Sequence, residues 1–179
     1  MLISLLACDN AGKPIQVREN SPYFNAEAYI QACIAKMNQQ SVGVRKTVRY
    51  NQEEDEQTFL SDTILWEQEL VLFKNLSIHK NALTGMYQVD SLESEDTITT
   101  IYQLLPEFEQ KSPTKRLKVH ARNGNCIGVE GEYLVENLLY KTNYQLRWQE
   151  EAFYEIKGER KIRFSKRVTS FSILGEFEI

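Results

Sequence analysis

The chain is poor in the side chains on which most enzymes rely for proton transfer and metal binding. Among its 179 residues there are two histidines, His79 and His120, and three cysteines, Cys8, Cys33 and Cys126. Histidine is the side chain most often used as an acid or base near neutral pH, and the spacing of the cysteines matches no zinc motif. We therefore expect no metal site and no cofactor.

Motifs that bind phosphates or activate nucleophiles are also missing. The sequence contains no Gly-x-Ser-x-Gly elbow, no His-Glu-x-x-His pair and no Walker loop. Gly124, Gly128 and Gly131 are too far apart for a dinucleotide fingerprint and lie among expected strands. We predict a protein that is not an enzyme. The alternative, an enzyme using Cys33 or Cys126, requires a thiol within hydrogen-bond reach of an imidazole.

No apolar run approaches the ~20 residues that a membrane-spanning helix needs. The chain also lacks an excess of positive charge, since 21 Lys and Arg against 25 Asp and Glu give a formal net charge of -4. This balance disfavours nucleic acid as a partner, because proteins that bind the phosphate backbone are usually basic. Hydrophobic residues at 42% and charged residues at 26% are typical of one folded domain.

The first eight residues have the pattern of a bacterial lipoprotein signal remnant. An apolar stretch ends in Ala7 directly before Cys8, which indicates a cleavage site after which Cys8 is acylated. Residues 9–20 are then a flexible spacer, and residues 21–179 form a single domain. The alternative is an ordinary apolar N-terminus of a cytosolic protein. With Cys8 modified, Cys33 and Cys126 remain as a disulfide or as two buried thiols, and the sequence favours neither.

Two N-terminal segments show helical periodicity. Residues 21–40 are expected to be a helix capped by Asn25, with Ala26, Ile30, Cys33 and Met37 on the buried face. Ser61-Asp62 is expected to cap a second helix with the apolar stripe Trp66, Leu70 and Phe73, and with Glu67, Gln68, Glu69 and Lys74 in water.

A strand is expected after Gly43, between the two helices. Lys46 interrupts its apolar side, which indicates an edge strand or an incompletely covered one. The acidic run Glu53 to Glu56 lacks the pattern of a calcium-binding loop and is expected at a solvated hairpin tip.

Beyond about Thr97 the hydrophobic period becomes two, which predicts successive antiparallel strands. Asn123-Gly124 is a hairpin signal, but strict pairing across it would place Val129 on the wrong face, so a bulge or a longer loop is expected. Gly158-Glu159 is expected to be a tight turn that sets Phe153 opposite Phe164. In the last strand one face is expected to carry Phe171, Ile173, Phe177 and Ile179, with a bend at Gly175.

These elements predict an α+β fold in which two N-terminal helices pack on a curved, mainly antiparallel sheet of about seven to nine strands. The C-terminal half is a β-meander. Two surfaces are candidates for binding. A cationic strand face, formed by Arg116, Lys118, His120 and Arg122, is suited to an anion or an acidic partner. The second surface is formed by aromatic residues along the expected sheet and is suited to a lipid tail or a sugar, or else belongs to the core. These residues are Tyr133, Tyr140, Tyr144, Trp148, Phe153 and Tyr154.

The chain resembles a group of uncharacterised cell-envelope lipoproteins from bacteria of the Bacteroidetes type. The shared features are the spacer after Cys8, Lys46-Thr47-Val48, the helix segment from Trp66 to Phe73, Leu139-Tyr140, and Tyr154-x-Ile156-x-Gly158. The resemblance implies a protein anchored to the outer membrane or the periplasmic face through Cys8.

The function expected on these grounds is a non-enzymatic envelope lipoprotein that binds an envelope protein complex or a surface component. A carrier whose curved sheet shelters a lipid or another hydrophobic ligand is the first alternative. A cytosolic globular protein is the second. An apolar cavity open at one rim would favour the carrier, and a filled core with an exposed apolar patch would favour the adaptor.

Overall fold

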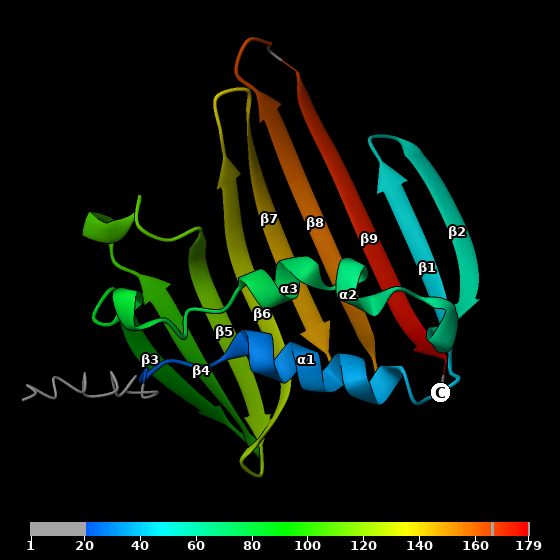
Figure 1. Ribbon diagram of the computed structural model, residues 1–179, viewed down its shortest axis with the longest axis horizontal. Coiled ribbons are helices and arrows are strands. Elements are labelled where there is room, and N and C mark those ends of the chain that lie inside the picture. The colour runs from blue at the N-terminus through cyan, green and yellow to red at the C-terminus, as the bar shows by residue number, and fades with distance from the viewer. Residues whose placement is uncertain (1–20, 166, 179) are drawn as a thin grey trace, which may run out of the picture.

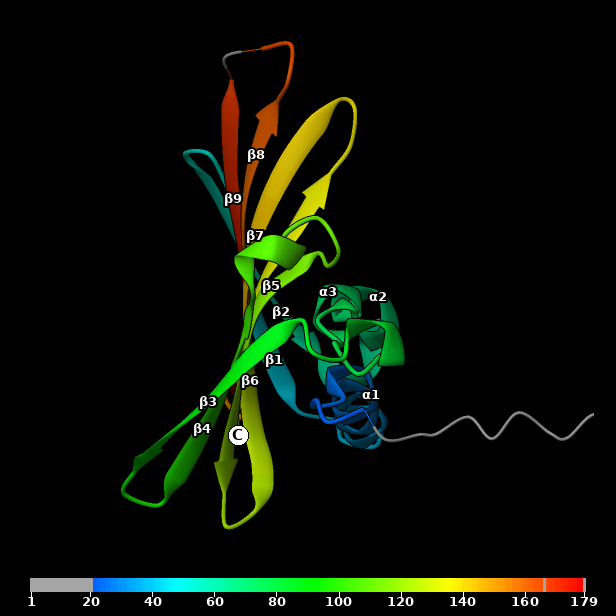
Figure 2. The same cartoon turned by 90° about the vertical axis from the view of Figure 1, so that its left-hand side faces the viewer.

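The computed structural model describes residues 21–165 and 167–178. They form an open, twisted antiparallel sheet with helices on one face (Figures 1 and 2). Its nine strands are β1 (Gly43–Tyr50), β2 (Glu53–Leu60), β3 (Tyr87–Ser94), β4 (Thr97–Leu104), β5 (Thr114–Arg122), β6 (Asn125–Glu136), β7 (Tyr140–Gln149), β8 (Phe153–Ile162) and β9 (Val168–Glu178). The helices are α1 (Ala26–Met37), α2 (Trp66–Glu69) and α3 (Val71–Asn75), with 3₁₀ turns at Ser61–Thr63, Asn81–Leu83 and Pro106–Phe108.

The strand order in the sheet is β2-β1-β9-β8-β7-β6-β5-β4-β3. Strands β3 to β9 follow one another as hairpins, which confirms the predicted antiparallel meander. The N-terminal hairpin of β1 and β2 joins the sheet beside the C-terminal strand, with Val44 opposite Phe177. The hairpin near the start of the domain and its last strand, β9, thereby become neighbours.

Helix α1 forms where the sequence predicts it. The Asn25 side chain accepts a hydrogen bond from the Ala28 N–H at 3.0 Å, so the predicted N-cap is confirmed. Its buried side chains are Ala26, Ile30, Cys33, Ile34 and Met37, which include the four expected on that face.

The prediction of one continuous second helix is wrong. Leu70, at φ -100° and ψ 14°, leaves helical geometry and divides the segment into α2 and α3. Ser61 and Asp62 form a 3₁₀ turn without a side-chain cap. The stripe of Trp66, Leu70 and Phe73 is nevertheless fully buried, as expected, because burial in the core holds these short pieces where helix propensity alone would not.

Glu69 does not face water, contrary to its prediction. Its carboxylate accepts a hydrogen bond from the Tyr154 hydroxyl at 2.9 Å and pairs with Lys46 at 2.8 Å. Lys46 thus interrupts the apolar side of β1 because it reaches a partner on α2. Strand β1 is internal, so the edge interpretation is wrong. The acidic run, expected at a hairpin tip, instead lies on β2, one of the two edge strands, where charge disfavours pairing with other chains.

The hairpin between β5 and β6 turns at Asn123 and Gly124, both with positive φ. His120 pairs with Gly128 and Ala121 pairs with Cys126, so Ile127 is the extra residue of a bulge. The bulge returns Val129 to a position opposite Val119 on the buried face, which confirms the prediction.

The predicted turn at Gly158 is wrong. Strand β8 continues through this residue, Phe153 lies opposite Gln149 and Glu176, and Phe164 is 80% exposed. A β-carbon at position 158 would overlap the ring of Phe171, which lies across the strand. This glycine therefore provides room for a ring, and the same holds for Gly175 beneath Tyr154. The predicted position of Ile179 lies outside the described residues.

The helices cover only one part of their face of the sheet (Figures 1 and 2). The core lies between this cover and the central strands, with Trp66, Phe73, Leu117, Leu146 and Tyr154 among its fully buried side chains. The ends of β6 to β9 and the β1–β2 hairpin extend beyond the helices in both views. One side of the sheet is therefore partly core and partly open surface.

Candidate functional site

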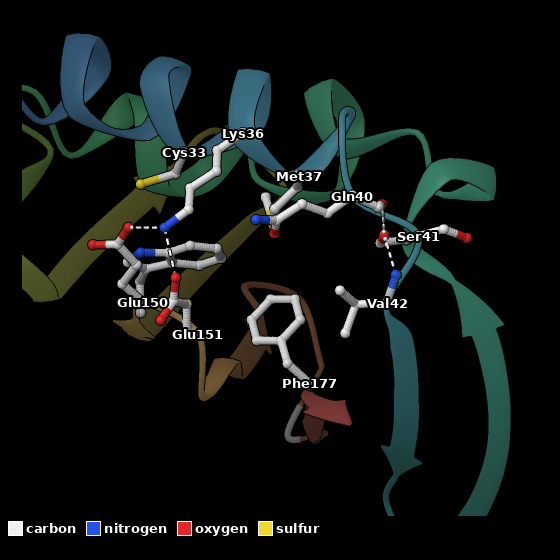
Figure 3. Close-up of a pocket in the computed structure, with 11 residues that line it drawn as sticks. Cys33, Lys36, Met37, Gln40, Ser41, Val42, Glu150, Glu151 and Phe177 are labelled. Atoms are coloured by element: carbon white, nitrogen blue, oxygen red, sulfur yellow. Dashed lines mark hydrogen bonds and ion pairs between the residues drawn. The ribbon is translucent and has the colours of Figure 1, made fainter. Parts of the chain in front are cut away.

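A hollow of about 430 Å³ opens between the C-terminal half of α1 and the sheet. We call it the α1 cleft, and Figure 3 shows its walls. It is lined by Cys33, Lys36 and Met37 of α1, by Gln40, Ser41, Val42 and Ser61 of the connections around β1 and β2, and by Trp148, Glu150, Glu151 and Phe177 of β7 to β9. Its volume is in the range typical of small-molecule sites.

The inner wall of the α1 cleft is apolar. Met37 and Trp148 are 8% and 3% exposed, and Val42 and Phe177 lie near one another on one side of the hollow (Figure 3). Phe177 also packs edge-on against Trp148, with ring centroids 5.9 Å apart. Such a surface gains free energy when an apolar ligand removes it from water.

Ser61 fixes the connection that forms one wall. Its hydroxyl donates a hydrogen bond to the carbonyl oxygen of Gln40 and accepts one from the Val42 N–H at 3.0 Å. The Ser61 N–H also donates to the Val42 carbonyl at 2.9 Å. Ser61 is 1% exposed, so these bonds hold the wall in place without a ligand.

Three charged side chains stand at the rim of the α1 cleft (Figure 3). Lys36 Nζ lies 2.9 Å from a carboxylate oxygen of Glu150 and 2.6 Å from one of Glu151. These hydrogen bonds raise the pKa of Lys36, so it stays charged. The ion pairs link α1 to the turn between β7 and β8 across the mouth of the cleft.

A cluster of weakly polar groups lies behind this rim. The Tyr29 hydroxyl is close to the thiols of Cys33 and Cys126, and neither it nor Trp148 Nε1 makes a well-aligned hydrogen bond within the described residues. Burial raises the pKa of the Cys33 thiol to about 11, and burial also raises the pKa of Cys126. Both thiols are free and protonated near neutral pH, which makes them poor nucleophiles.

The thiol–imidazole pair required by the enzyme alternative is not formed among the described residues. Cys126 donates to the carbonyl of Gly128, His79 Nδ1 lies 2.9 Å from the Tyr23 carbonyl oxygen, and His120 Nδ1 lies 3.0 Å from the Thr99 hydroxyl. No group of three potential metal ligands occurs in this part of the chain.

The predicted cationic face lies on the side of the sheet away from the helices, and acidic side chains share it. Within this face Arg116 pairs with Glu132, Lys118 and His120 with Glu130, and Arg122 with Asp96. Burial lowers the pKa of His120, and Glu130 opposes this shift. The four basic residues thus form one row, but their charge is largely balanced, and its role in binding an anion stays a prediction.

Four aromatic side chains form a second candidate surface beyond the helices. Strand register aligns Tyr133 with Tyr144, Tyr144 with Gly158, and Gly158 with Phe171, which lies beside Tyr50. Ring centroids are 6.5 Å apart for Tyr133 and Tyr144, and 5.9 Å apart for Tyr144 and Phe171. We call Tyr50, Tyr133, Tyr144 and Phe171 the aromatic row, whose outer member Tyr50 is 53% exposed.

Sequence reasoning placed Cys33, Met37 and Phe177 in the core but did not predict the cleft that they line. Lys36, Glu150 and Glu151 carry no motif, and only the fold brings them together. The proposed lipid site Cys8 and the spacer at 9–20 lie outside the described residues. No described helix is long and apolar enough to cross a membrane.

Comparison with known proteins gives no relative from which a function can be transferred. No protein-family model, curated protein or solved structure matches the chain. The resemblance to envelope lipoproteins therefore stays a prediction, and functional proposals rest on the geometry of the α1 cleft and the aromatic row.

Proposed function

We propose that this protein is a non-catalytic binding protein that holds a small hydrophobic ligand, such as a single alkyl chain, in the α1 cleft. The proposal rests chiefly on one observation, an open hollow of about 430 Å³ with Met37, Val42, Trp148 and Phe177 in its wall. A filled core would leave no such space, because protein interiors are usually packed without voids of this size.

The hydrogen-bonded wall supports the same function. Ser61 holds the connection from Gln40 to Val42 through two side-chain hydrogen bonds. The cleft is therefore formed before the ligand binds, and the free-energy cost of ordering loops on binding is small. This favours a carrier or a sensor of an apolar molecule.

Filling the cleft is expected to weaken ligand binding. Val42→Phe places a ring in the hollow and should weaken the binding of an uncharged fluorescent probe, N-phenyl-1-naphthylamine, by about tenfold or more, since loss of a few buried methylene contacts costs at least 1.4 kcal/mol. The measurement is a fluorescence titration of folded protein. Val48→Phe is the matched control, because Val48 is 37% exposed and lies outside the cleft. Equal affinities for both variants and wild type would reject the cleft as the binding site.

The aromatic row supports a second candidate function, an adaptor that binds an envelope protein. Exposed aromatic surface is typical of protein interfaces. A photo-cross-linking amino acid at Tyr50 is expected to give a discrete protein adduct in cells, whereas the same residue at Arg45, on the opposite face of β1, is not. Adducts of equal yield at both positions would argue against this function.

We also propose that the domain is tethered to the cell envelope through lipid on Cys8. The pattern of residues 1–8 supports this. Labelling with a fatty-acid probe, in cells that express the gene with its native upstream codons, is expected for wild type and should be lost in Cys8→Ala. Equal labelling of the two proteins would eliminate the anchored state.

A further inference from the structure

The charges at the rim of the α1 cleft indicate which hydrophobic ligands it accepts. One ammonium group, on Lys36, faces two carboxylates, on Glu150 and Glu151. Within the described residues, Lys36 is the only ion-pair partner of either carboxylate. The rim therefore carries one negative charge in excess of its positive charge.

The same carboxylates have unused capacity to accept hydrogen bonds. Each carboxylate has two oxygens, and only one of each is bonded to Lys36. Their side chains are 32% and 61% exposed, so a ligand group at the mouth can reach them. Among the described residues of the lining, Cys33 is the only other titratable group, and it is uncharged near neutral pH because burial raises its pKa to about 11.

The polar rim and the apolar wall lie on different sides of the hollow. Figure 3 shows Lys36, Glu150 and Glu151 together, with Phe177 and Val42 across the hollow from them. A molecule with an alkyl chain and one polar end can thus bury the chain against the apolar side and leave its end group among the three charges. The cleft has the polarity of a site for a single-chain amphiphile.

We propose that the preferred ligand is an amphiphile with a cationic end group, of the alkylammonium class, and that Glu150 and Glu151 select against fatty acids. This inference rests on the proposed function of the α1 cleft. An ammonium group completes two pairs of opposite charges at the rim. A ligand carboxylate instead becomes the third negative group around one lysine, which is unfavourable.

The size of the selectivity follows from the exposure of the rim. Exposed ion pairs usually contribute no more than about 1 kcal/mol each. Replacing an end group that the rim attracts by one that it repels doubles the difference in binding free energy between the two ligands. We therefore expect decylammonium to bind about fivefold or more tightly than decanoate at pH 7 and low salt, with 1-decanol between them. The preference should fall as salt is added.

The test is a titration of wild type with decylammonium, decanoate and 1-decanol, each below its aggregation concentration, followed by calorimetry or by displacement of N-phenyl-1-naphthylamine. The double variant Glu150→Gln, Glu151→Gln should lose the preference for the ammonium and keep its affinity for decanol. Lys36→Gln removes the lysine cation of the rim and should increase the preference for the ammonium. Opposite responses of these variants are not expected from a general loss of folding.

Three outcomes overturn the inference. Equal binding of all three ligands, or tighter binding of decanoate, rejects the charge selection while the hydrophobic site stands. A preference for decylammonium that survives in the Glu150→Gln, Glu151→Gln variant assigns the selection to other charges and also rejects it. Failure of every ligand, including 1-decanol, rejects the proposed function itself.

Discussion

Trp66→Ala is expected to lower the free energy of unfolding by about 3–5 kcal/mol, a large part of the stability of a domain of this size. Trp66 is 1% exposed at the start of α2. Its ring packs edge-on against Tyr154 at 5.9 Å and in a tilted arrangement against Phe177 at 6.0 Å, and its Nε1–H donates to the Ser61 carbonyl at 2.7 Å. The substitution therefore removes packing, leaves a cavity and breaks a buried hydrogen bond.

Urea denaturation followed by far-ultraviolet circular dichroism measures this loss without relying on tryptophan fluorescence. Leu65→Ala is the matched control, since Leu65 is adjacent and 69% exposed, and its effect should stay within about 0.5 kcal/mol. Trp66→Phe should fall between the two. A Trp66→Ala loss no larger than that of Leu65→Ala would contradict the packing of α2 on the sheet.

Raising the pH from 9 to 11 is expected to destabilise the protein by on the order of 5 kcal/mol. The groups with the largest shifts are Cys33 and three tyrosines, Tyr29, Tyr87 and Tyr154, in all of which burial is the main cause that raises the pKa. The pKa of Cys33 rises to about 11 and that of Tyr87 to about 12.

The direction of this change in stability with pH follows from the number of protons that the folded and unfolded states bind. Between the lower pKa of each group in the unfolded chain and its higher pKa in the folded protein, the folded state holds more protons, so stability falls as pH rises. The loss begins near pH 9, where the unfolded cysteine ionises, and steepens near pH 10, where unfolded tyrosines ionise. Below pH 8 these four groups contribute no pH dependence.

Urea denaturation at pH 8, 9, 10 and 11 measures this dependence. Tyr29→Phe is the most informative variant, because the Tyr29 hydroxyl is buried without a well-aligned hydrogen bond. Its removal should raise stability at pH 8 by about 1 kcal/mol and reduce the alkaline loss. Tyr50→Phe, at an exposed tyrosine, should change neither. A constant free energy of unfolding up to pH 11 would contradict the burial of these groups.

Local patterns predicted the elements whose geometry depends on nearby residues. Asn25 and the spacing from Ala26 to Met37 specify α1, because a cap and a buried face lie within one helix. The bulge at Ile127 was predictable for a similar reason. Strict pairing across the turn would place Val119 and Val129 on opposite faces of the sheet, and both residues belong to one hairpin. The wrong predictions concern residues whose partners are distant. Gly158 by itself predicts a turn, but in the structure it makes room for the ring of Phe171. Lys46 by itself predicts an edge strand, but in the structure it pairs with Glu69.

The candidate site depends on distant partners throughout. Lys36 meets Glu150 and Glu151, and Val42 lies near Phe177, only because the β1–β2 hairpin joins the sheet at its C-terminal strand. No spacing in the chain encodes that contact.

The sequence by itself determined the antiparallel strands, the first helix and the buried apolar stripe, because period, caps and turn residues act over a few positions. The tertiary structure decided which strands are edges, where glycine makes room for a ring, and that an apolar cleft with a charged rim exists. These features arise from the order of strands in the sheet, and that order is set by contacts between residues far apart along the chain.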